Sequence, residues 1–324
     1  MSNVTETGLF SSAEELEQAN REAGWNLEYH QLMPGPFFSG FACRAWADSL
    51  VMRESFVSSL EVRGEPPSDM TAIIIPGKPC ARVTLNGAEV TEGRLFLVPP
   101  GAAIDAFVLG ELEAYSIYLP ESVFQEAARC VDPSWHDRRP SEALSLRAAP
   151  QRVDALRREL GMWLGGADST DDLAHQVRAS NFALKVAALT LENECDSEFE
   201  QAYRSVAHRK QLSLAREYMD VNFQHAVKMT HVCAYAGVGL RTLERVFQHE
   251  LNLSPSRYLL ARRLSTVRRV LVSSGPGRGV IKRIAIDHGF THMGRFSVEY
   301  RRQFGETPSQ TLNEVRLPLP VSVH

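Results

Sequence analysis

The sequence predicts an α+β protein in which a β-rich N-terminal part precedes an all-α part built from two helix-turn-helix motifs. Three observations predict it. Between residues 30 and 119, short runs rich in Val, Ile, Phe and Tyr alternate with Pro-Gly and Asn-Gly pairs, which is typical of strands and turns. After residue 203, apolar residues recur every three or four positions, as in amphipathic helices. There a helix–glycine–helix pattern occurs twice, around Gly237 and Gly289.

A chain of 324 residues can form two domains, each with its own core. We expect residues 1–28 to be an N-terminal segment with a short surface helix. Residues 29–200 are expected to form the β-rich domain, with helices from about 120, and residues 201–317 the all-α domain. The densely acidic residues 192–200 are predicted to be the linker between them.

Charge is distributed unevenly along the chain. Residues 203–316 contain 19 Lys+Arg and 8 Asp+Glu, whereas the remaining residues contain 16 Lys+Arg and 31 Asp+Glu. A basic module on an acidic body is typical of proteins that bind phosphate backbones. The five cysteines are odd in number and form no C-x-x-C pair, which indicates reduced thiols and no disulfide framework.

The β-rich part has six strand-like runs, and many short strands with turns between them predict a sandwich or barrel, including the double-sheet jelly roll. Apolar helices are expected to follow between residues 120 and 191. Two interpretations of these helices stay open: they cover the sheet, or they form a dimer interface. The strand-like runs are residues 37–46, 50–62, 71–75, 81–85, 94–98 and 115–119.

The second helix-turn-helix motif is predicted at about residues 280–303. Gly289 tolerates the positive φ at which a chain leaves a helix, so the first helix should end there. Thr291 is predicted to cap the second helix, and Gly305 to end it. Such a unit docks its second helix in the DNA major groove. Four apolar side chains of this helix should point inward: Met293, Phe296, Tyr300 and Phe304.

The first motif, at about residues 229–250, has the same plan around Gly237, and its second helix should turn Leu240, Leu243, Phe247 and Leu251 inward. A long helix is predicted between the motifs, capped by Ser254, with Pro255 in its first turn. It carries one apolar stripe. Five arginines lie off that stripe: Arg257, Arg262, Arg263, Arg268 and Arg269. They form a solvated face or contact phosphates, and both interpretations stay open.

These motifs carry a resemblance to a known family. The run GFTHMGRFSVEYRRQFGETPSQTL, residues 289–312, resembles the signature of the AraC/XylS family of bacterial transcription regulators. Within it, the pattern GRFS-x-x-Y-x-x-x-FGE-x-PS-x-TL is similar to the sequences of regulators of the ethanolamine-operon type. The run GVGLRTLERVFQHELNLSPSRYL, residues 237–259, looks like the family's first motif but has Gly239 where the family usually has a serine. The resemblance covers about the last third of the chain.

The resemblance implies a transcription regulator that reads a bipartite promoter site with both second helices. It also implies a cupin-like N-terminal domain for effector binding or dimerisation. We therefore expect double-stranded DNA and RNA polymerase as partners, a homodimer, and control by a small-molecule effector or by dimerisation. No apolar run approaches the ~18 residues of a membrane span, and the acidic N-terminus lacks a signal-peptide pattern. We expect a cytoplasmic protein, associated with the nucleoid when bound to DNA.

The resemblance also implies which side chains meet DNA. Arg241 and Arg245 are one helical turn apart, and their guanidinium groups suit guanine O6 and N7. Glu244 is expected to contact a cytosine amino group or to orient Arg245. Val298 stands where the family frequently has arginine, so only an apolar contact is expected there. The expected base-facing residues are Arg241, Thr242, Glu244, Arg245, Thr291, Gly294, Arg295 and Val298, and the expected phosphate contacts are Gln248, His249, Arg301 and Arg302.

A cupin-like domain can also be an enzyme with a metal held by clustered histidines. Within residues 1–200 the only histidines are His30, His136 and His175, and no two of them are close in sequence. We therefore expect no metal, no cofactor and no catalysed reaction. The alternative function is a cupin-like enzyme or ligand-binding module tethered to a DNA-binding anchor.

Overall fold

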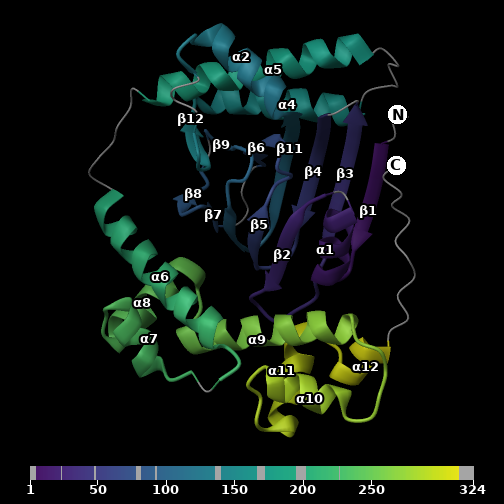
Figure 1. The fold of residues 1–324 in the computed structure, drawn as a ribbon, viewed down its shortest axis with the longest axis vertical. Helices are drawn as coiled ribbons and strands as arrows, with labels where there is room; N and C mark the ends of the chain where they lie inside the picture. Colours follow the sequence, from purple (N-terminus) through teal and green to yellow (C-terminus); the bar gives the residue numbers. More distant parts are fainter. Residues whose placement is uncertain are drawn as a thin grey trace.

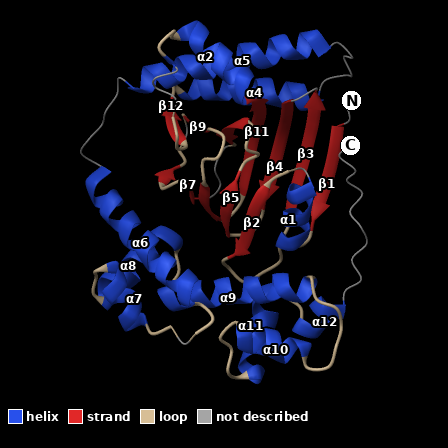
Figure 2. Ribbon diagram, in the orientation of Figure 1, coloured by secondary structure: helices blue, strands red, loops and turns tan. Residues whose placement is uncertain are grey.

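The computed structural model of the protein describes residues 5–22, 24–46, 49–77, 82–91, 93–135, 140–165, 172–194, 202–225 and 227–313. A β-sandwich lies between two groups of helices, one group along each end of the molecule in the view of Figure 1. Figure 2 shows the same arrangement by secondary structure. None of the helices in the described residues has the length and apolarity needed to cross a bilayer.

The sandwich consists of two antiparallel sheets. The seven-stranded sheet has the order β1-β3-β4-β11-β6-β9-β12, and the five-stranded sheet has the order β2-β5-β10-β7-β8. The first sheet contains β1 (Thr5–Phe10), β3 (Ser39–Trp46), β4 (Ser49–Phe56), β6 (Met70–Pro76), β9 (Arg94–Val98), β11 (Leu112–Pro120) and β12 (Leu144–Arg147). The second contains β2 (Asn26–Gln31), β5 (Leu60–Glu65), β7 (Arg82–Leu85), β8 (Ala88–Glu89) and β10 (Ile104–Leu109).

The seven-stranded sheet is buried on both faces. Along β6, Ile73 and Ile75 point to one core, whereas Ala72 and Ile74 point to the other, because successive side chains of a strand alternate between faces. One core lies between the two sheets. The other lies under three helices that cover the outer face: α2 (Glu121–Val131), α4 (Pro150–Gly165) and α5 (Asp172–Glu194). The helices predicted from about residue 120 therefore do cover the sheet.

The predicted strand run at residues 50–62 is wrong as a single strand. The chain forms β4, pairs it with β3 and β11, and then crosses to the other sheet at residues 57–59, where β5 pairs with β2 and β10. Both strands are rich in apolar residues, so the sequence pattern gives no break between them.

The N-terminal segment is part of the sandwich. Residues Thr5–Phe10 form the edge strand β1, which pairs with β3 along its whole length. The short surface helix predicted within residues 1–28 is present as α1 (Ala13–Glu22), but it is not a surface helix. Glu14, Leu16 and Glu17 are buried in it. Leu16 packs into the core between the sheets, whereas Glu14 and Glu17 face arginines of the C-terminal helices.

The C-terminal part is helical and has two cores. The first core contains α6, α7, α8 and the start of α9, together with Leu32 and Phe107 from the sandwich. The second contains the end of α9 with α10, α11 and α12. The predicted acidic linker falls largely on residues 195–201, which lie outside the described residues. The helices are α6 (Ala202–Asn222), α7 (Met229–Ala236), α8 (Leu240–Leu251), α9 (Pro255–Val272), α10 (Val280–Asp287), α11 (Met293–Phe304) and α12 (Pro308–Asn313).

Candidate nucleic-acid interface

The turn of the first motif is built on Gly237. Its φ of 66° is left-handed, a conformation that glycine adopts without steric cost. The amide of Val238 donates to the carbonyl of Cys233 at 3.0 Å, which ends α7. Gly239 precedes α8 with an extended backbone and no side-chain cap, and its carbonyl accepts from the Thr242 amide at 3.0 Å. The helix thus starts as predicted in spite of the missing serine.

Helix α8 buries one face and exposes the other. Leu243, Phe247 and Leu251 are buried as predicted. The prediction for Leu240 is wrong: it is 49% exposed, because it lies at the first residue of the helix, and Val246 takes the fourth inward position. The predicted contact residues Arg241, Glu244, Arg245, Gln248 and His249 are exposed, and Thr242 is half-buried.

The turn of the second motif requires glycine. Gly289 has a φ of 82°, and the amide of Phe290 donates to the Ala285 carbonyl at 2.9 Å. A Cβ atom at Gly289 would lie 3.0 Å from Cζ of Arg263 and 3.1 Å from the Phe223 carbonyl oxygen. A larger residue would therefore push the motif away from α6 and α9.

Helix α11 presents the second exposed face. It begins at Met293, and His292 takes the N-cap position without a side-chain bond, so the prediction of Thr291 as the cap is wrong. Phe296 and Tyr300 are buried as predicted. Val298, an apolar side chain, is 67% exposed on the opposite face. The other predicted contact residues of this motif are also exposed: Thr291, Gly294, Arg295, Arg301 and Arg302.

Helix α9 joins the motifs and packs against the five-stranded sheet as well. Ser254 caps it as predicted, accepting from the Arg257 amide at 3.3 Å. Within the five-stranded sheet it contacts β2 and β5, and Figure 1 shows it running beneath the sandwich. No residue from 257 to 271 is fully exposed. The helix therefore has more buried surface than the single stripe that the sequence predicts.

The centre of this contact is Glu61 of β5, which is fully buried. An Nη2 atom of Arg216 lies 2.6 Å from its carboxylate and one of Arg63 lies 2.7 Å away. The Tyr258 hydroxyl donates to it at 2.9 Å. Burial acts to raise the pKa of Glu61, but Arg216, Arg262 and Arg63 together hold that pKa well below its usual range. The carboxylate is therefore ionised and shared between both parts of the chain.

Two aspartates extend this group. Arg216 donates to both carboxylate oxygens of Asp105, at 2.7 and 2.8 Å. Arg262 donates to Asp220 at 3.1 Å, and Arg63 contacts the same carboxylate. We call this set of seven residues the Glu61 cluster: Glu61, Arg63, Asp105, Arg216, Asp220, Tyr258 and Arg262.

A second ionic contact lies at the other end of α9. Arg268 donates to Glu14 of α1 at 3.0 Å, and Arg269 donates to both oxygens of Glu17, at 2.7 and 2.9 Å. Burial raises the pKa of Glu17, and Arg269 opposes that rise. Gln303 of α11 donates to the backbone carbonyl of Gln31 at 2.9 Å. For Arg262, Arg268 and Arg269 the structure therefore shows neither a solvated face nor an open phosphate site.

The sequence held one signal for these contacts. The acidic balance of the N-terminal part mirrors the basic balance of residues 203–316, and part of this complementarity is satisfied within the chain. Glu14 and Glu17 are three residues apart, so they share one face of α1. Their partners are about 250 positions away, and charge pattern alone does not name them.

The end of α8 also contacts the sandwich. Arg82 of β7 donates to the backbone carbonyl of His249 and lies 3.7 Å from the carboxylate of Glu250. The imidazole of His249 lies 3.0 Å from the other carboxylate oxygen of Glu250. His249 thus has neighbours within the chain, and its predicted phosphate contact stays a prediction.

Comparisons with known proteins agree with this geometry. Residues 232–314, which include both turns and both exposed helices, match the family described as Helix-turn-helix domain. The XylDLEGF operon transcriptional activator of Pseudomonas putida is 26% identical over 226 residues, covering 69% of this chain and 68% of that protein. The probable thc operon regulatory protein of Rhodococcus erythropolis is 34% identical over 102 residues, covering 32% of this chain and 31% of that protein.

The chain carries an AraC-type helix-turn-helix domain and is similar to AraC/XylS transcription regulators. It is a DNA-binding transcription regulator, with its helix-turn-helix domain at residues 232–314. A solved AraC-type transcriptional regulator from Chromobacterium violaceum is 31% identical and covers 32% of this chain and 90% of that one, with a TM-score of 0.30.

Proposed function

We propose that this AraC/XylS regulator reads a bipartite promoter site with α8 and α11. The observation that carries the proposal is the pair of exposed polar faces, with Arg241 and Arg245 on α8 and Arg295 on α11, held by one continuous helix. Two such helices suit successive major-groove segments, about 34 Å apart. The chain would then act by binding alone, without a catalysed reaction.

Selection of binding sites from random DNA by the full-length protein tests this proposal. Two preferred blocks of bases with centres about 10 base pairs apart are expected. One block, or no preferred sequence, would rule out reading by both helices. The same selection with Arg295→Ala is the control, because this variant should lose base preference only in the block read by α11.

Control of DNA binding is proposed to lie in the N-terminal domain. The Glu61 cluster, Arg268 and Arg269 join that domain to α9, the helix that sets the spacing of α8 and α11. An effector or a dimer contact that moves the five-stranded sheet would therefore move both DNA-reading helices. The two-sheet sandwich, with its apolar core between the sheets, supports a cupin-like effector domain.

Homodimerisation is proposed to use α4 and α5. Three large apolar side chains on these helices are exposed: Met162 by 67%, Leu173 by 68% and Val177 by 52%. Exposed apolar side chains gathered on neighbouring elements favour a protein contact.

RNA polymerase is the further partner that we propose for a promoter-bound regulator. The sequence pattern of residues 294–312 supports assigning this protein to the subgroup of regulators of the ethanolamine-operon type.

A further inference from the structure

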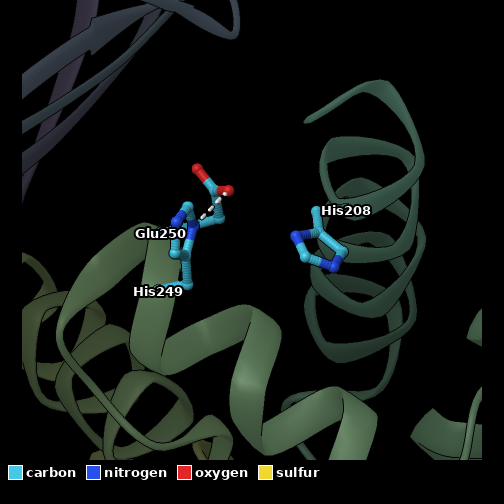
Figure 3. Close-up of side chains that lie close together, drawn as sticks. All are labelled: His208, His249 and Glu250. Atoms are coloured by element: carbon cyan, nitrogen blue, oxygen red, sulfur yellow. Dashed lines mark hydrogen bonds and ion pairs between the residues drawn. The ribbon is translucent and has the colours of Figure 1, made fainter. Parts of the chain in front are cut away.

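Three metal-ligating side chains meet where α6 approaches the end of α8. They are His208 of α6 with His249 and Glu250 of α8, and one ligand atom from each lies within 4.8 Å of the others. Figure 3 shows the imidazole of His208 facing the His249–Glu250 pair across the space between the two helices. The ring centroids of His208 and His249 are 6.0 Å apart.

The donor set is that of a transition-metal site. Two imidazoles and one carboxylate are ligands that Zn²⁺ accepts at about 2.0–2.2 Å, and three protein ligands leave positions open for water. His249 Nδ1 and Glu250 Oε1 are already 3.0 Å apart, close to the separation of adjacent ligands at those bond lengths. The ligand atom of His208 lies within 4.8 Å of the other two, so a turn of its side chain toward them would complete the set.

The surroundings fix one ligand and leave two free to adjust. Glu250 is 9% exposed, and Arg82 approaches its Oε2 atom, at 3.7 Å, so Oε1 stays on the side of the two imidazoles. His249 is exposed and His208 is half-buried, so both rings can turn. The carboxylate is therefore oriented toward the two imidazoles, as a ligand held by an outer contact should be, and both rings can turn to direct a nitrogen at a shared ion.

We propose that His208, His249 and Glu250 bind one divalent first-row transition-metal ion of the Zn²⁺ class. The ion would tie α6 to the last turn of α8, next to the contact of Arg82 with the same turn. This inference goes beyond the proposed DNA reading and does not depend on it. It also revises the expectation of no metal, which rested on histidines of residues 1–200 only.

The test is titration of the full-length protein with Co²⁺, followed by visible absorption, and displacement of Co²⁺ by Zn²⁺. His208→Gln and His249→Gln each remove one ligand from an accessible position. His231→Gln is the matched control, because His231 is exposed on α7 of the same domain and is outside the cluster. Circular dichroism checks that all three variants fold.

Wild type and His231→Gln are expected to bind one Co²⁺ per chain with the same visible band, which Zn²⁺ abolishes. Each ligand variant should weaken Co²⁺ binding about ten-fold or more. The proposal is overturned if wild type gives no band at millimolar Co²⁺. It is equally overturned if either ligand variant binds as wild type does.

Discussion

Two sets of arginine residues in the C-terminal part have different surroundings. Arg241 and Arg245 are exposed on α8, whereas Arg216 and Arg268 are buried against carboxylates of the N-terminal part. A buried charge is stable only when it is paired, so the second group is committed to contacts within the chain. Of these two sets, the exposed one is free to meet DNA in this arrangement.

Arg245→Ala should relax base preference in one half of the site by about 1–3 kcal/mol, because one guanidinium fork that pairs with guanine is lost. Arg301→Ala should instead weaken binding to all sequences alike and lower the salt slope by about one unit, as expected for a phosphate contact. The measurement is affinity for single-base variants of a selected site. Arg158→Ala, which removes an equal charge from exposed α4, is the control. If the two variants exchange these effects, the assigned roles are wrong.

Glu54 of β4 is a half-buried titratable group on the strand face that points between the sheets, with no hydrogen bond or ion pair to the rest of the described chain. Burial raises its pKa from 4.5 to about 7. A carboxyl with a raised pKa stabilises the fold fully below 4.5, and this contribution is lost as pH rises through 7. Its ionised form is therefore unfavourable at pH 8.

Glu54→Gln should raise the free energy of unfolding at pH 8 by about 1–3 kcal/mol and change it little at pH 4.5. Denaturant unfolding at both pH values measures the difference. Glu113→Gln, at an exposed position of β11, is the control and should give no pH-dependent gain. Equal effects of Glu54→Gln at both pH values would show that its ionisation does not limit stability.

Helix α9 is the element on which both halves of the molecule depend. Its apolar residues divide between the two helix-turn-helix cores, and Arg262, Arg268 and Arg269 face the sandwich. Because a helix is rigid over its 18 residues, a movement imposed at one end is transmitted to the other. The acid–arginine contacts therefore fix the position of the motifs as well as the stability of the fold.

Glu61→Gln should lower the free energy of unfolding by about 3–5 kcal/mol, because it leaves buried arginines without their shared carboxylate. Urea unfolding followed by fluorescence measures the loss. Glu65→Gln, on the same strand but exposed, should have little effect. A Glu61→Gln protein as stable as wild type would mean that the remaining Asp105 and Asp220 carboxylates satisfy the cluster.

At the scale of the whole molecule, the acidic N-terminal part neutralises arginines of the basic C-terminal part. A fragment of residues 203–316 should bind DNA by itself, with affinity falling about a thousand-fold between about 50 and 200 mM salt. It should also bind random DNA more tightly than the full chain, because Arg262, Arg268 and Arg269 lose their carboxylate partners. Fluorescence anisotropy over this salt range measures both. Affinity that does not change with salt would contradict the charge argument.

The full-length chain is expected to be a dimer and the 203–316 fragment a monomer, because the exposed apolar residues of α4 and α5 are absent from the fragment. Met162→Glu should shift the full chain toward monomer by placing like charges in the contact. Val221→Glu, on α6 and 78% exposed in wild type, should leave the dimer intact. Light scattering at micromolar concentration is the measurement, and a dimeric fragment would place the interface elsewhere.

Local features of the fold were predictable from the sequence. The turns at Gly237 and Gly289, the Ser254 cap and the inward faces of α8 and α11 are largely confirmed. Each of these depends on backbone conformation or on contacts within a few residues, so the residues that cause it are neighbours in the sequence. The exposed arginines of the first motif follow from the same helical spacing.

Contacts between distant segments were decided by the tertiary structure. The pairing of Glu14 and Glu17 with Arg268 and Arg269 joins residues about 250 positions apart, and the approach of His208 to His249 joins two separate helices. Charge and residue type state what a side chain can bind, but they carry no information about which partner the folded chain brings near. That choice depends on how the sandwich packs against α9, and this packing is set by all the cores together.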